Sequence, residues 1–524
     1  MQIMAQPGSG PTLPHILGRA ARLAWVLLRR LAPVLLHPTS ARLYRAIRQA
    51  IEDLGLTYLK FGQFLAMRFD ILPPGLCQEL AHLFEAVEPI PFAEIRAVIT
   101  AELGAPPEQL YDRLDPVPIA AASVAQVHIA WTRTGEKVAV KVQRPGIGPT
   151  FEADMRLLAA YGGLLDRLGL SAVFSVRETV EEFALWTRGE LDFTQEGHVA
   201  ERLLREAGPW ERFPRIHWNL TSQRVLTSQF IEGPTLGKVL ARMEQVGDGP
   251  EAEAELRRSF PSLDLSLFGH NLVQSVLHQL FSRGFFHGDP HPGNIIVGLD
   301  NKVTFIDFGI FGELHPRQRR ILARQIERIS IGDIDGCYEC VREQYVAATD
   351  TTDWHAFEHE TKGRLSAWYR ASMDPNSSLK ARHLGNHSGE IIDAARRHGL
   401  RGGSNSLLYW RALYMLDASA LKLGAHIDLF AEMALFFRSQ AETLNLLLPL
   451  YGEPDAVIDP ARSSALRRLI ARLTSGARVR GLQLRQRLSH QGQQQRERTV
   501  GHVILLLLLL GGALLLLKPL RGAA

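Results

Sequence analysis

The chain has 524 residues, of which 46% are hydrophobic, and a formal net charge of +4 at pH 7. This length exceeds one hydrophobic core and predicts roughly three modules, while the small net charge excludes a strongly basic protein, so no nucleic acid is expected as a partner. Three cysteines cannot form a disulfide framework, which indicates a reducing compartment for the soluble part.

Residues 1–42 are expected to form a tail followed by an amphipathic helix, without a signal peptide. The run from Leu17 to Leu36 is apolar but is interrupted by arginines, which is typical of a helix with a basic face rather than a membrane span. Contact with a membrane surface and contact with a protein groove both fit this pattern.

Residues 43–115 are expected to form a helical extension. Apolar residues recur at steps of three and four over 43–65, which predicts an amphipathic helix. Lys60 and Gln63 fall together on another face of this helix, where they can reach one ligand or one partner surface. Such a pair is more often simply solvated, and Gly62 between them lets a neighbouring backbone come close.

Residues 116–233 change to a β pattern. A loop of small residues at 120–123 stands at the head of a β-hairpin with strands at 124–131 and 138–142. Strand alternation turns the three valines of the second strand to the core and Lys141 to the opposite side. There Lys141 is either a solvated edge residue or, in a nucleotide cleft, the group that reaches the phosphates and needs a helix-borne carboxylate.

That carboxylate is expected in the helical stretch 190–196, and Glu196 is the residue we choose. A strand at 224–231 follows, and the break at 232–234 predicts a hinge between two lobes. Residues 243–264 are polar and are interpreted as a variable excursion.

A helix at 265–283 leads into His287-Gly288-Asp289-Pro290-His291-Pro292-Gly293-Asn294, and Asp307-Phe308-Gly309 follows. In phosphoryl transfer an Asp faces the attacking hydroxyl, an Asn five residues later reaches Mg²⁺, and a second Asp holds the metal that bridges the phosphates. Asp289, Asn294 and Asp307 have this order. Strands at 295–297 and 303–306, joined by turn residues, would bring the two ends of the pattern together.

Histidines and cysteines near this pattern are interpreted as structural. Two prolines keep the loop irregular, which argues against zinc ligation by His287 and His291 from one helical face and favours a role in fixing the loop. Cys337 and Cys340 form a lone CxxC and are interpreted as packed thiols rather than a metal or redox site. Residues 311–450 are expected to be mostly helical.

The chain ends with a basic segment and an apolar one. The linker 456–500 contains the arginine-rich stretch 462–498, which would lie either on anionic headgroups or in solvent. The apolar run 503–517 is short for a bilayer core of about 30 Å. Basic flanks and local thinning of the bilayer nevertheless favour a membrane anchor within 501–524.

Taken in order, these residues resemble the UbiB/ADCK family of atypical kinase-like proteins over about 45–345. The resemblance implies an α+β, bilobed protein-kinase-like fold, with a helical N-terminal extension and a C-terminal membrane-anchoring helix. It places the N-lobe at 116–233 and the C-lobe at 234–455. The motifs that carry it are Lys60-Phe61-Gly62-Gln63 (the family's KxGQ), Ala120-Ala121-Ala122-Ser123-Val124-Ala125-Gln126-Val127-His128, Val138-Ala139-Val140-Lys141-Val142-Gln143-Arg144-Pro145-Gly146, the segment 190–196, and the two motifs described above.

The resemblance implies roles for these positions. Lys141 would pair with Glu196 and bind the phosphates of ATP, Asn294 and Asp307 would hold Mg²⁺, and Asp289 would be the catalytic-loop carboxylate. In the family, the helix that carries Lys60 and Gln63 lies over the active site, in space that a protein substrate would need. The other implied nucleotide contacts come from the alanine-rich loop and the hinge: Ala120, Ala121, Ala122, Ser123, Val124, Gln229 and Ile231.

Three features depart from the family pattern. Gln229 replaces the usual acid at the nucleotide hinge, residues 83–85 read Leu-Phe-Glu where Leu-Gln-Asp is common, and one C-terminal apolar segment stands where many members have two. The first bears on the adenine contacts and the last on membrane topology.

The family is associated with coenzyme Q biosynthesis and membrane lipid homeostasis. The resemblance therefore implies a membrane-associated, Mg²⁺-dependent ATPase or atypical kinase that supports ubiquinone biosynthesis or lipid handling. Expected partners are ATP, membrane lipids, quinone or phenol intermediates and ubiquinone-biosynthesis enzymes. The expected location is the bacterial inner membrane, with the kinase-like domain in the cytoplasm.

Two other functions fit part of the pattern. A small-molecule kinase of the aminoglycoside or choline type shares the Asp…Asn…Asp order but has no KxGQ extension. A scaffold that binds nucleotide as a switch, without turnover, would use the same groups, because binding and turnover need the same contacts.

Overall fold

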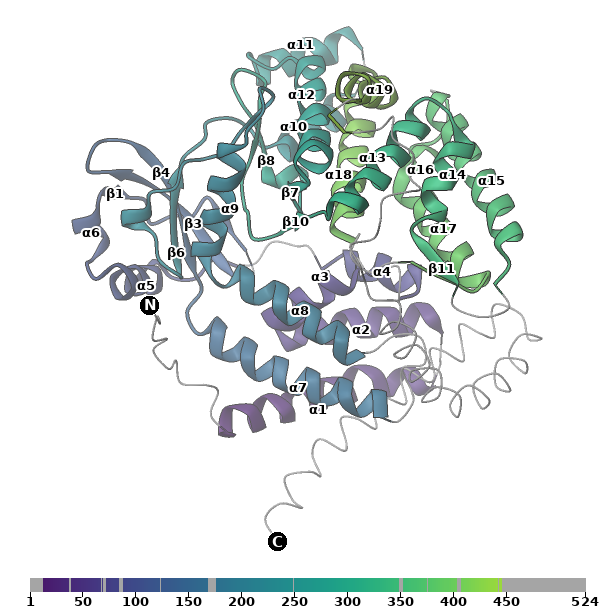
Figure 1. The fold of residues 1–524 in the computed structure, drawn as a ribbon. Coiled ribbons are helices and arrows are strands. Elements are labelled where there is room, and N and C mark those ends of the chain that lie inside the picture. The colour runs from purple at the N-terminus through teal and green to yellow at the C-terminus, as the bar shows by residue number, and fades with distance from the viewer. Residues whose placement is uncertain are drawn as a thin grey trace, which may run out of the picture. The chain divides into compact units, whose positions relative to one another are not determined.

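The computed structural model describes residues 13–36, 39–66, 68, 72–83, 88–122, 124–167, 176–247, 249–347, 352–374, 376–402, 407–441 and 443–444. These residues fall into two compact units (Figure 1). The first unit draws on the segments 1–85 and 148–182, and the second on 86–147 and 183–448.

The first unit is helical. The Thr39 hydroxyl caps α2 by accepting a hydrogen bond from a backbone amide of its first turn. Leu31 and Val34 of α1 belong to one buried cluster with Leu43 and Ala46 of α2. The helices are α1 (Leu13–Leu36), α2 (Ser40–Leu54), α3 (Leu56–Ala66), α4 (Pro74–Ala81), α7 (Ile147–Arg167) and the first turns of α8 (Val176–Glu190).

The single amphipathic helix expected from residue 43 is wrong, because two helices occupy that stretch. α2 ends at Leu54 and α3 begins at Leu56. Gly55 lies between them with φ 98°, a conformation that L side chains rarely adopt. The apolar spacing continues across this break, which is why periodicity alone did not reveal it.

The expected basic face of α1 is wrong in part. Arg19 forms an ion pair with Asp154 at 2.6 Å, and Arg30 forms one with Asp53 at 2.6 Å, so both arginines are used within the unit. The outward face carries exposed apolar side chains beside Arg29, including Trp25 at 57% and Leu28 at 59% exposure.

None of the helices in the described part of the chain has the length and hydropathy needed to cross a membrane. The predicted anchor at 503–517 and the arginine-rich stretch at 462–498 lie outside the described residues.

The second unit begins with a five-stranded antiparallel sheet. The strand order is β1-β3-β4-β6, and β2 pairs with β3 at its other end. The strands are β1 (Tyr111–Leu114), β2 (Ala120–Ala121), β3 (Ala125–Thr132), β4 (Lys137–Gln143) and β6 (Val225–Gln229).

The predicted alternation along the Lys141 strand is confirmed. Val138, Val140 and Val142 of β4 are fully buried, in a cluster that includes Ile95 and Val98 of α5 (Phe92–Leu103). Lys141 lies on the opposite side, as the period of two requires. The helix α5 and the short α6 (Pro107–Leu110) thus cover one face of the sheet and leave the other for the candidate site.

Two of the expected elements differ in the structure. Tyr111–Leu114 was expected to be helical and is β1, which pairs with β3, because tertiary pairing decides such a short segment. The expected excursion at 243–264 contains the helix α11 (Pro250–Ser259), which begins with Pro250 in its first turn and carries acidic residues there.

Helix α9 (Phe193–Arg205) packs against the sheet through Phe193 and delivers Glu196. Asp192 caps it, since its carboxylate accepts a hydrogen bond from the Thr194 amide. The predicted hinge follows β6, and Gly233 is required there, because a Cβ would lie 2.3 Å from the carbonyl oxygen of Val297.

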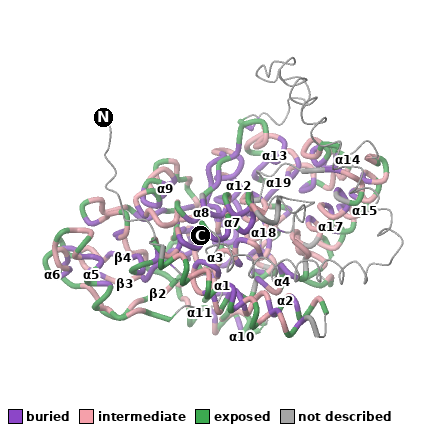
Figure 2. Tube along the Cα trace, turned by 90° about the horizontal axis from the view of Figure 1, so that it is seen from below, coloured by how far each residue is buried: buried purple, intermediate pink, exposed green. Residues whose placement is uncertain are grey.

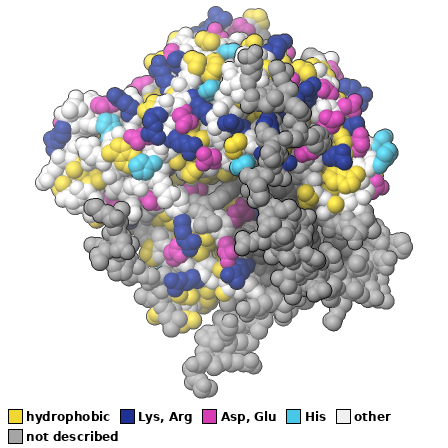
Figure 3. All heavy atoms as spheres, in the orientation of Figure 1, with side chains coloured by type: hydrophobic (Ala, Val, Ile, Leu, Met, Phe, Trp, Pro, Cys, Tyr) yellow, Lys and Arg dark blue, Asp and Glu magenta, His cyan; other side chains and the backbone are white. Residues whose placement is uncertain are grey.

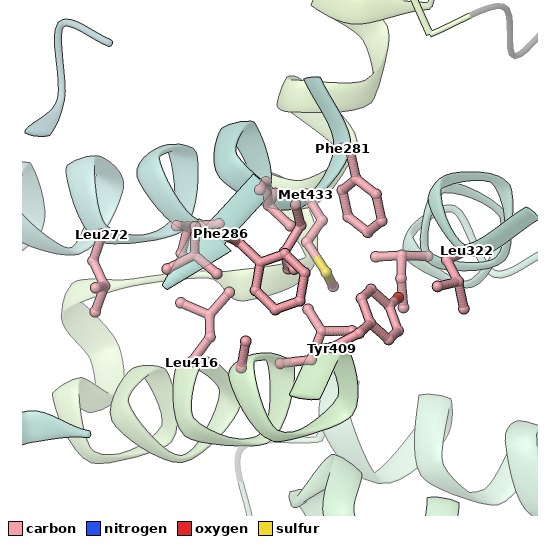
Figure 4. Close-up of a cluster of buried hydrophobic side chains, with 14 of the residues drawn as sticks. Leu272, Phe281, Phe286, Leu322, Tyr409, Leu416 and Met433 are labelled. Carbon is pink, nitrogen blue, oxygen red and sulfur yellow. The ribbon is translucent and has the colours of Figure 1, made fainter. Parts of the chain in front are cut away.

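Helices dominate the rest of the second unit. They enclose a large apolar core, part of which Figure 4 shows with Phe281, Phe286, Tyr409 and Met433 converging. In Figure 2 the trace of α12 is mostly buried, as expected for a central helix. The helices are α10 (Leu236–Val246), α11, α12 (Leu265–Leu277), the π-helix η2 (His278–Arg283), α13 (Pro316–Ser330), α14 (Ile334–Arg342), α15 (Trp354–Met373), α16 (Leu379–Arg382), α17 (Leu384–Arg397), α18 (Leu407–Leu423) and α19 (Leu429–Gln440), with short 3₁₀ turns η1 (Trp218–Leu220), η3 (Pro292–Asn294) and η5 (Gly424–His426).

Short strands frame the catalytic-loop motif. The predicted hairpin is present as β8 and β9, and β7 pairs with β10. The interpretation of Cys337 and Cys340 as packed thiols is confirmed, because both side chains are buried. The strands are β5 (Glu211–Arg212), β7 (Phe285–His287), β8 (Ile295–Val297), β9 (Val303–Phe305), β10 (Phe311–Glu313), β11 (Tyr345–Ala347) and β12 (Leu400–Gly402).

Candidate functional site

An ion pair between β4 and α9 forms the centre of the candidate site. Lys141 Nζ donates to both carboxylate oxygens of Glu196, at 2.8 and 2.9 Å, so the expected pairing is present. The Glu196 side chain is 2% exposed, and burial raises the pKa of its carboxyl. Burial also opposes the charge on Lys141, but the carboxylates of Asp307 and Glu196 outweigh it and raise the pKa of Lys141.

Asp307 joins this pair in an unusual backbone conformation. Its Oδ1 accepts a hydrogen bond from Lys141 Nζ at 3.0 Å. Its φ is 67°, in the left-handed region that residues other than glycine rarely occupy. The amide of the next residue, Phe308, donates to the Glu196 carboxylate at 3.1 Å. The Asp307 carbonyl accepts from His287 Nε2 at 2.8 Å. These bonds hold the conformation that directs the carboxylate to Lys141.

His287 fixes the catalytic loop to Asp307. Its Nε2–H donates to the Asp307 carbonyl, and its Nδ1 accepts from the Asp289 amide at 3.1 Å. These partners assign a neutral ring with the proton on Nε2, and burial lowers the pKa of His287 accordingly. His291 likewise accepts from the Gly293 amide at 3.1 Å. The predicted loop-fixing role of both histidines is confirmed.

Gly288 permits a close approach between the catalytic loop and the strand that follows Asp307. Its amide donates to the Ile310 carbonyl at 2.9 Å, and a Cβ at this position would lie 2.7 Å from Cγ2 of Ile310. A larger residue would therefore separate β7 from β10.

The β8–β9 hairpin brings Asn294 close to the Asp307 turn. The Ile306 amide donates to the Asn294 carbonyl at 2.9 Å. The side-chain Nδ2–H of Asn294 donates to the Asp289 carbonyl at 3.2 Å, which leaves its Oδ1 as the free donor atom for a cation. Glu190 adds a further carboxylate near this turn, since its Cγ lies 3.3 Å from the Cβ position of Gly309.

The donor set of Asn294 and Asp307 fits Mg²⁺. Carboxylate and amide oxygens suit this ion, which keeps several waters and also uses substrate phosphates as ligands. Across the described residues, His, Cys, Asp and Glu side chains form no group of three or more that could hold a metal by themselves. A cation at Asn294 and Asp307 would complete its shell with waters and substrate phosphates.

Arg411 of α18 is a part of the site that the sequence did not predict. Its guanidinium forms an ion pair with Oδ1 of Asp289 at 2.7 Å, and the two side chains are 14% and 20% exposed. The catalytic loop itself has no lysine or arginine between His287 and Asn294. A cation from a helix far along the chain thus reaches the catalytic-loop carboxylate, and no local sequence motif predicts this ion pair.

The alanine-rich loop starts as a strand. Ala120 and Ala121 form β2 and pair with Val127 and Gln126 of β3. Val124 is 7% exposed and belongs to a buried cluster, so its side chain is not directed to solvent. Ala122 connects these parts, and Ser123 lies outside the described residues.

The hinge residues lie at and beyond the end of β6. Gln229 pairs with Val138, and its amide donates to the Arg215 carbonyl at 2.8 Å. That amide is therefore not a donor for an adenine ring. Ile231 follows and is partly buried.

Lys60 and Gln63 lie in the first unit, on α3. Gln63 Nε2 donates to the Leu83 carbonyl at 2.9 Å. Gly62 accommodates the side chains of Ile51 and Leu83, not a backbone as expected, since a Cβ there would lie 2.4 Å from a Leu83 methyl. The position of Lys60 and Gln63 over the nucleotide site stays a prediction.

Comparison with known proteins identifies the family. A family model described as the ABC1 atypical kinase-like domain matches residues 82–341. A Synechocystis protein of uncharacterized function is 30% identical over 296 residues, which are 55% of this chain and 69% of that protein. The chain belongs to the ABC1 atypical kinase-like family, which is the UbiB/ADCK family that the motifs resemble.

Other family members are similar over about half of this chain. The "Probable protein kinase UbiB" of Marinobacter nauticus is 35% identical over 287 residues, 53% of this chain and 50% of its own length. The chloroplastic "Protein ACTIVITY OF BC1 COMPLEX KINASE 3" of Arabidopsis thaliana is 35% identical over 304 residues, 57% of this chain and 40% of its own. The alignments thus span about half the length of these relatives.

A solved structure supports the kinase-like fold. A Mycobacterium tuberculosis protein in complex with erythromycin matches with a TM-score of 0.51 at 21% identity, over 75% of this chain and 92% of its own. At this identity the match shows the fold alone. The second unit is therefore a kinase-like domain of mixed helices and sheet.

Proposed function

We propose that this ABC1 family member is a membrane-associated, Mg²⁺-dependent ATPase or kinase of a small acceptor that supports ubiquinone biosynthesis or lipid handling. The observation that carries the proposal is the bonded cluster of Lys141, Glu196 and Asp307 beside Asp289 and Asn294. These are the groups that phosphoryl transfer requires, and the protein already holds them with hydrogen bonds.

Each residue of the cluster has a role that follows from its position. Lys141, kept cationic by its carboxylate partners, would bind nucleotide phosphates on the open face of the sheet. Asn294 and Asp307 would hold Mg²⁺, which supplies charge neutralisation on the phosphates when bound. Asp289 would orient the attacking hydroxyl or water.

Arg411 adds positive charge at the same place. Its guanidinium lies 2.7 Å from Asp289, so it can turn to the transferred group as negative charge develops there. Arginines that act in this way in other phosphoryl-transfer enzymes stabilise the transition state.

The segment after Asp307 favours a small acceptor. Only residues 310–315 separate Gly309 from the first residue of α13, and β10 takes up part of them. Protein kinases have an activation loop in this place, which they order by phosphorylation. The short connection leaves no such loop, and this supports water or a small molecule as acceptor independently of Lys60 and Gln63.

ATP turnover is the direct test. Purified protein should hydrolyse ATP slowly in the presence of Mg²⁺, faster with anionic vesicles and quinone-like phenols, and should not transfer radiolabel to generic protein substrates. Asp307→Asn should remove most of the Mg²⁺ dependence. Efficient labelling of proteins by the wild type, or an unchanged Mg²⁺ response in Asp307→Asn, would contradict the proposal. A phosphorylated phenol among the products would favour the small-molecule kinase over the ATPase.

The exposed face of α1 supports membrane association. Trp25 and Leu28 are more than half exposed, Arg29 stacks over the Trp25 ring at 5.1 Å, and α1 has no acidic residue. Tryptophan beside arginine suits the headgroup region of a bilayer. Basic and acidic side chains intermingle over the face shown in Figure 3.

Vesicle flotation tests this part. The double substitution Trp25→Ser and Leu28→Ser is made both in a chain truncated after residue 499 and in the full chain. It should weaken the binding of the truncated chain to anionic vesicles, whereas the full chain should stay bound through its C-terminal segment. Leu379→Ser is a matched control, because Leu379 is 56% exposed in the other unit. Full-length protein that stays soluble at low salt would refute the anchor.

A further inference from the structure

Arg144, the first residue after β4, is buried beneath the alanine-rich loop. It is 7% exposed. Its Nε donates to the Ala122 carbonyl at 2.9 Å, and its second guanidinium nitrogen donates to the Glu88 carbonyl at 2.6 Å. Its own amide donates to the Val124 carbonyl at 2.9 Å. One side chain therefore joins two segments that are far apart in sequence.

The two segments differ in kind. Ala122 belongs to the alanine-rich loop, which stands where a kinase has its phosphate-covering loop. Glu88 belongs to the stretch just before α5, on the side of the sequence toward α3, which carries the KxGQ motif. Gln126 of β3 holds the same stretch, because its side chain accepts from the Ile90 amide at 2.9 Å and donates to the Ile90 carbonyl at 3.4 Å.

The Arg144 guanidinium donates to backbone carbonyls rather than to a carboxylate. Its side-chain partners among the described residues are both backbone carbonyls, and burial lowers the pKa of its guanidinium. Burying such a charge costs free energy that only well-formed hydrogen bonds can offset. The planar fork of arginine can bond two carbonyls at once in fixed directions, whereas lysine offers a single point of charge.

We propose that Arg144 is a positioning residue that couples the alanine-rich loop to the segment before α5. Any shift of Ala122 as the loop meets phosphates changes the same guanidinium that holds Glu88. Nucleotide binding at the loop is therefore transmitted to the segment before α5. This inference rests on the proposed function, because it needs a nucleotide at the loop.

Hydrogen exchange with and without Mg²⁺–ADP tests the coupling. In the wild type, nucleotide should slow exchange at Ile119 and Ala122, whose amides donate to the Val127 and Ala125 carbonyls of β3. It should also slow exchange at Ile90, which lies outside the proposed nucleotide contacts. In Arg144→Lys, exchange at all three amides should be about tenfold faster without nucleotide, and nucleotide should protect the loop alone. A purely structural arginine would raise basal exchange but would not separate the two responses.

Arg113→Lys is the control, because Arg113 lies in the same sheet but its side chain is 64% exposed. It should leave both responses as in the wild type. Binding is measured first by titration with a fluorescent ADP analogue. Binding without protection at Ile90 in the wild type would overturn the coupling alone, even if the variant failed to fold. An absence of binding would overturn the proposed function as well.

Discussion

Glu196→Gln isolates the charge at the centre of the site. The substitution keeps the shape of the side chain, and a glutamine oxygen can still accept from the Phe308 amide, now 3.1 Å from Glu196. It removes the charge that Lys141 meets at 2.8 and 2.9 Å. Breaking a buried ion pair from one side typically costs about 3–5 kcal/mol. Lys141 keeps Asp307 at 3.0 Å, so we expect a loss of about 2 kcal/mol in the free energy of unfolding.

The remaining Lys141–Asp307 contact has a consequence for the metal. Without Glu196, the whole charge of Lys141 acts on the carboxylate that would hold Mg²⁺. Half-maximal nucleotide binding should then need about tenfold more Mg²⁺, the equivalent of ~1.4 kcal/mol. Nucleotide affinity at saturating Mg²⁺ should change much less.

Urea unfolding and Mg²⁺ titration of nucleotide binding measure the two effects. Glu201→Gln is the control, because Glu201 lies on the same helix and bonds the Trp218 indole at 2.6 Å instead of Lys141. An unchanged Mg²⁺ requirement in Glu196→Gln would show that Glu196 does not hold Lys141 away from the metal carboxylate, and the account of the site would fail.

Two further predictions concern α18. Arg411→Ala should lower the turnover number for ATP by about 100-fold in steady-state hydrolysis, with little change in nucleotide affinity. Lys422→Ala on the same helix should leave the turnover number unchanged. Faster turnover in Arg411→Ala would mean that Arg411 restrains Asp289 instead. Burial raises the pKa of Asp417 to about 7 from an ordinary 3.8. Between these pH values the folded protein binds a proton that the unfolded chain does not, so the free energy of unfolding falls as pH rises from about 4 to 7. Asp417→Asn should therefore be the more stable protein by about 3 kcal/mol at pH 8 and by much less at pH 5 in urea unfolding, and equal gains at both pH values would contradict this sign.

Local patterns predicted the parts of the site that lie close together in sequence. The period of two placed Lys141 opposite the core valines, and turn residues placed the hairpin that joins Asn294 to the Asp307 segment. Both follow from the backbone geometry of strands and turns, which a short window of sequence contains. The choice of Glu196 from several acidic residues also agreed with the structure, because Glu196 is the carboxylate that pairs with Lys141.

Features decided by distant contacts could not be predicted in this way. Arg411 meets Asp289 only because α18 packs in the core of the second unit, and nothing near either residue indicates the pair. The segment Tyr111–Leu114 is too short for a period to be clear, so its pairing with β3 decided its structure. The positive φ of Asp307 is a third case, since propensity disfavours it and only the surrounding bonds maintain it.

Those bonds organise the candidate site before any ligand binds. The Asp307 carbonyl is held by His287, the next amide by Glu196, and the carboxylate by Lys141. His287 in turn accepts from the Asp289 amide, so Asp307 and Asp289 are parts of one hydrogen-bonded network. A network assembled by the protein requires little reorganisation when charge develops on the transferred group. Control of this site would then have to act on parts outside the network, such as the alanine-rich loop that Arg144 holds through the Ala122 carbonyl.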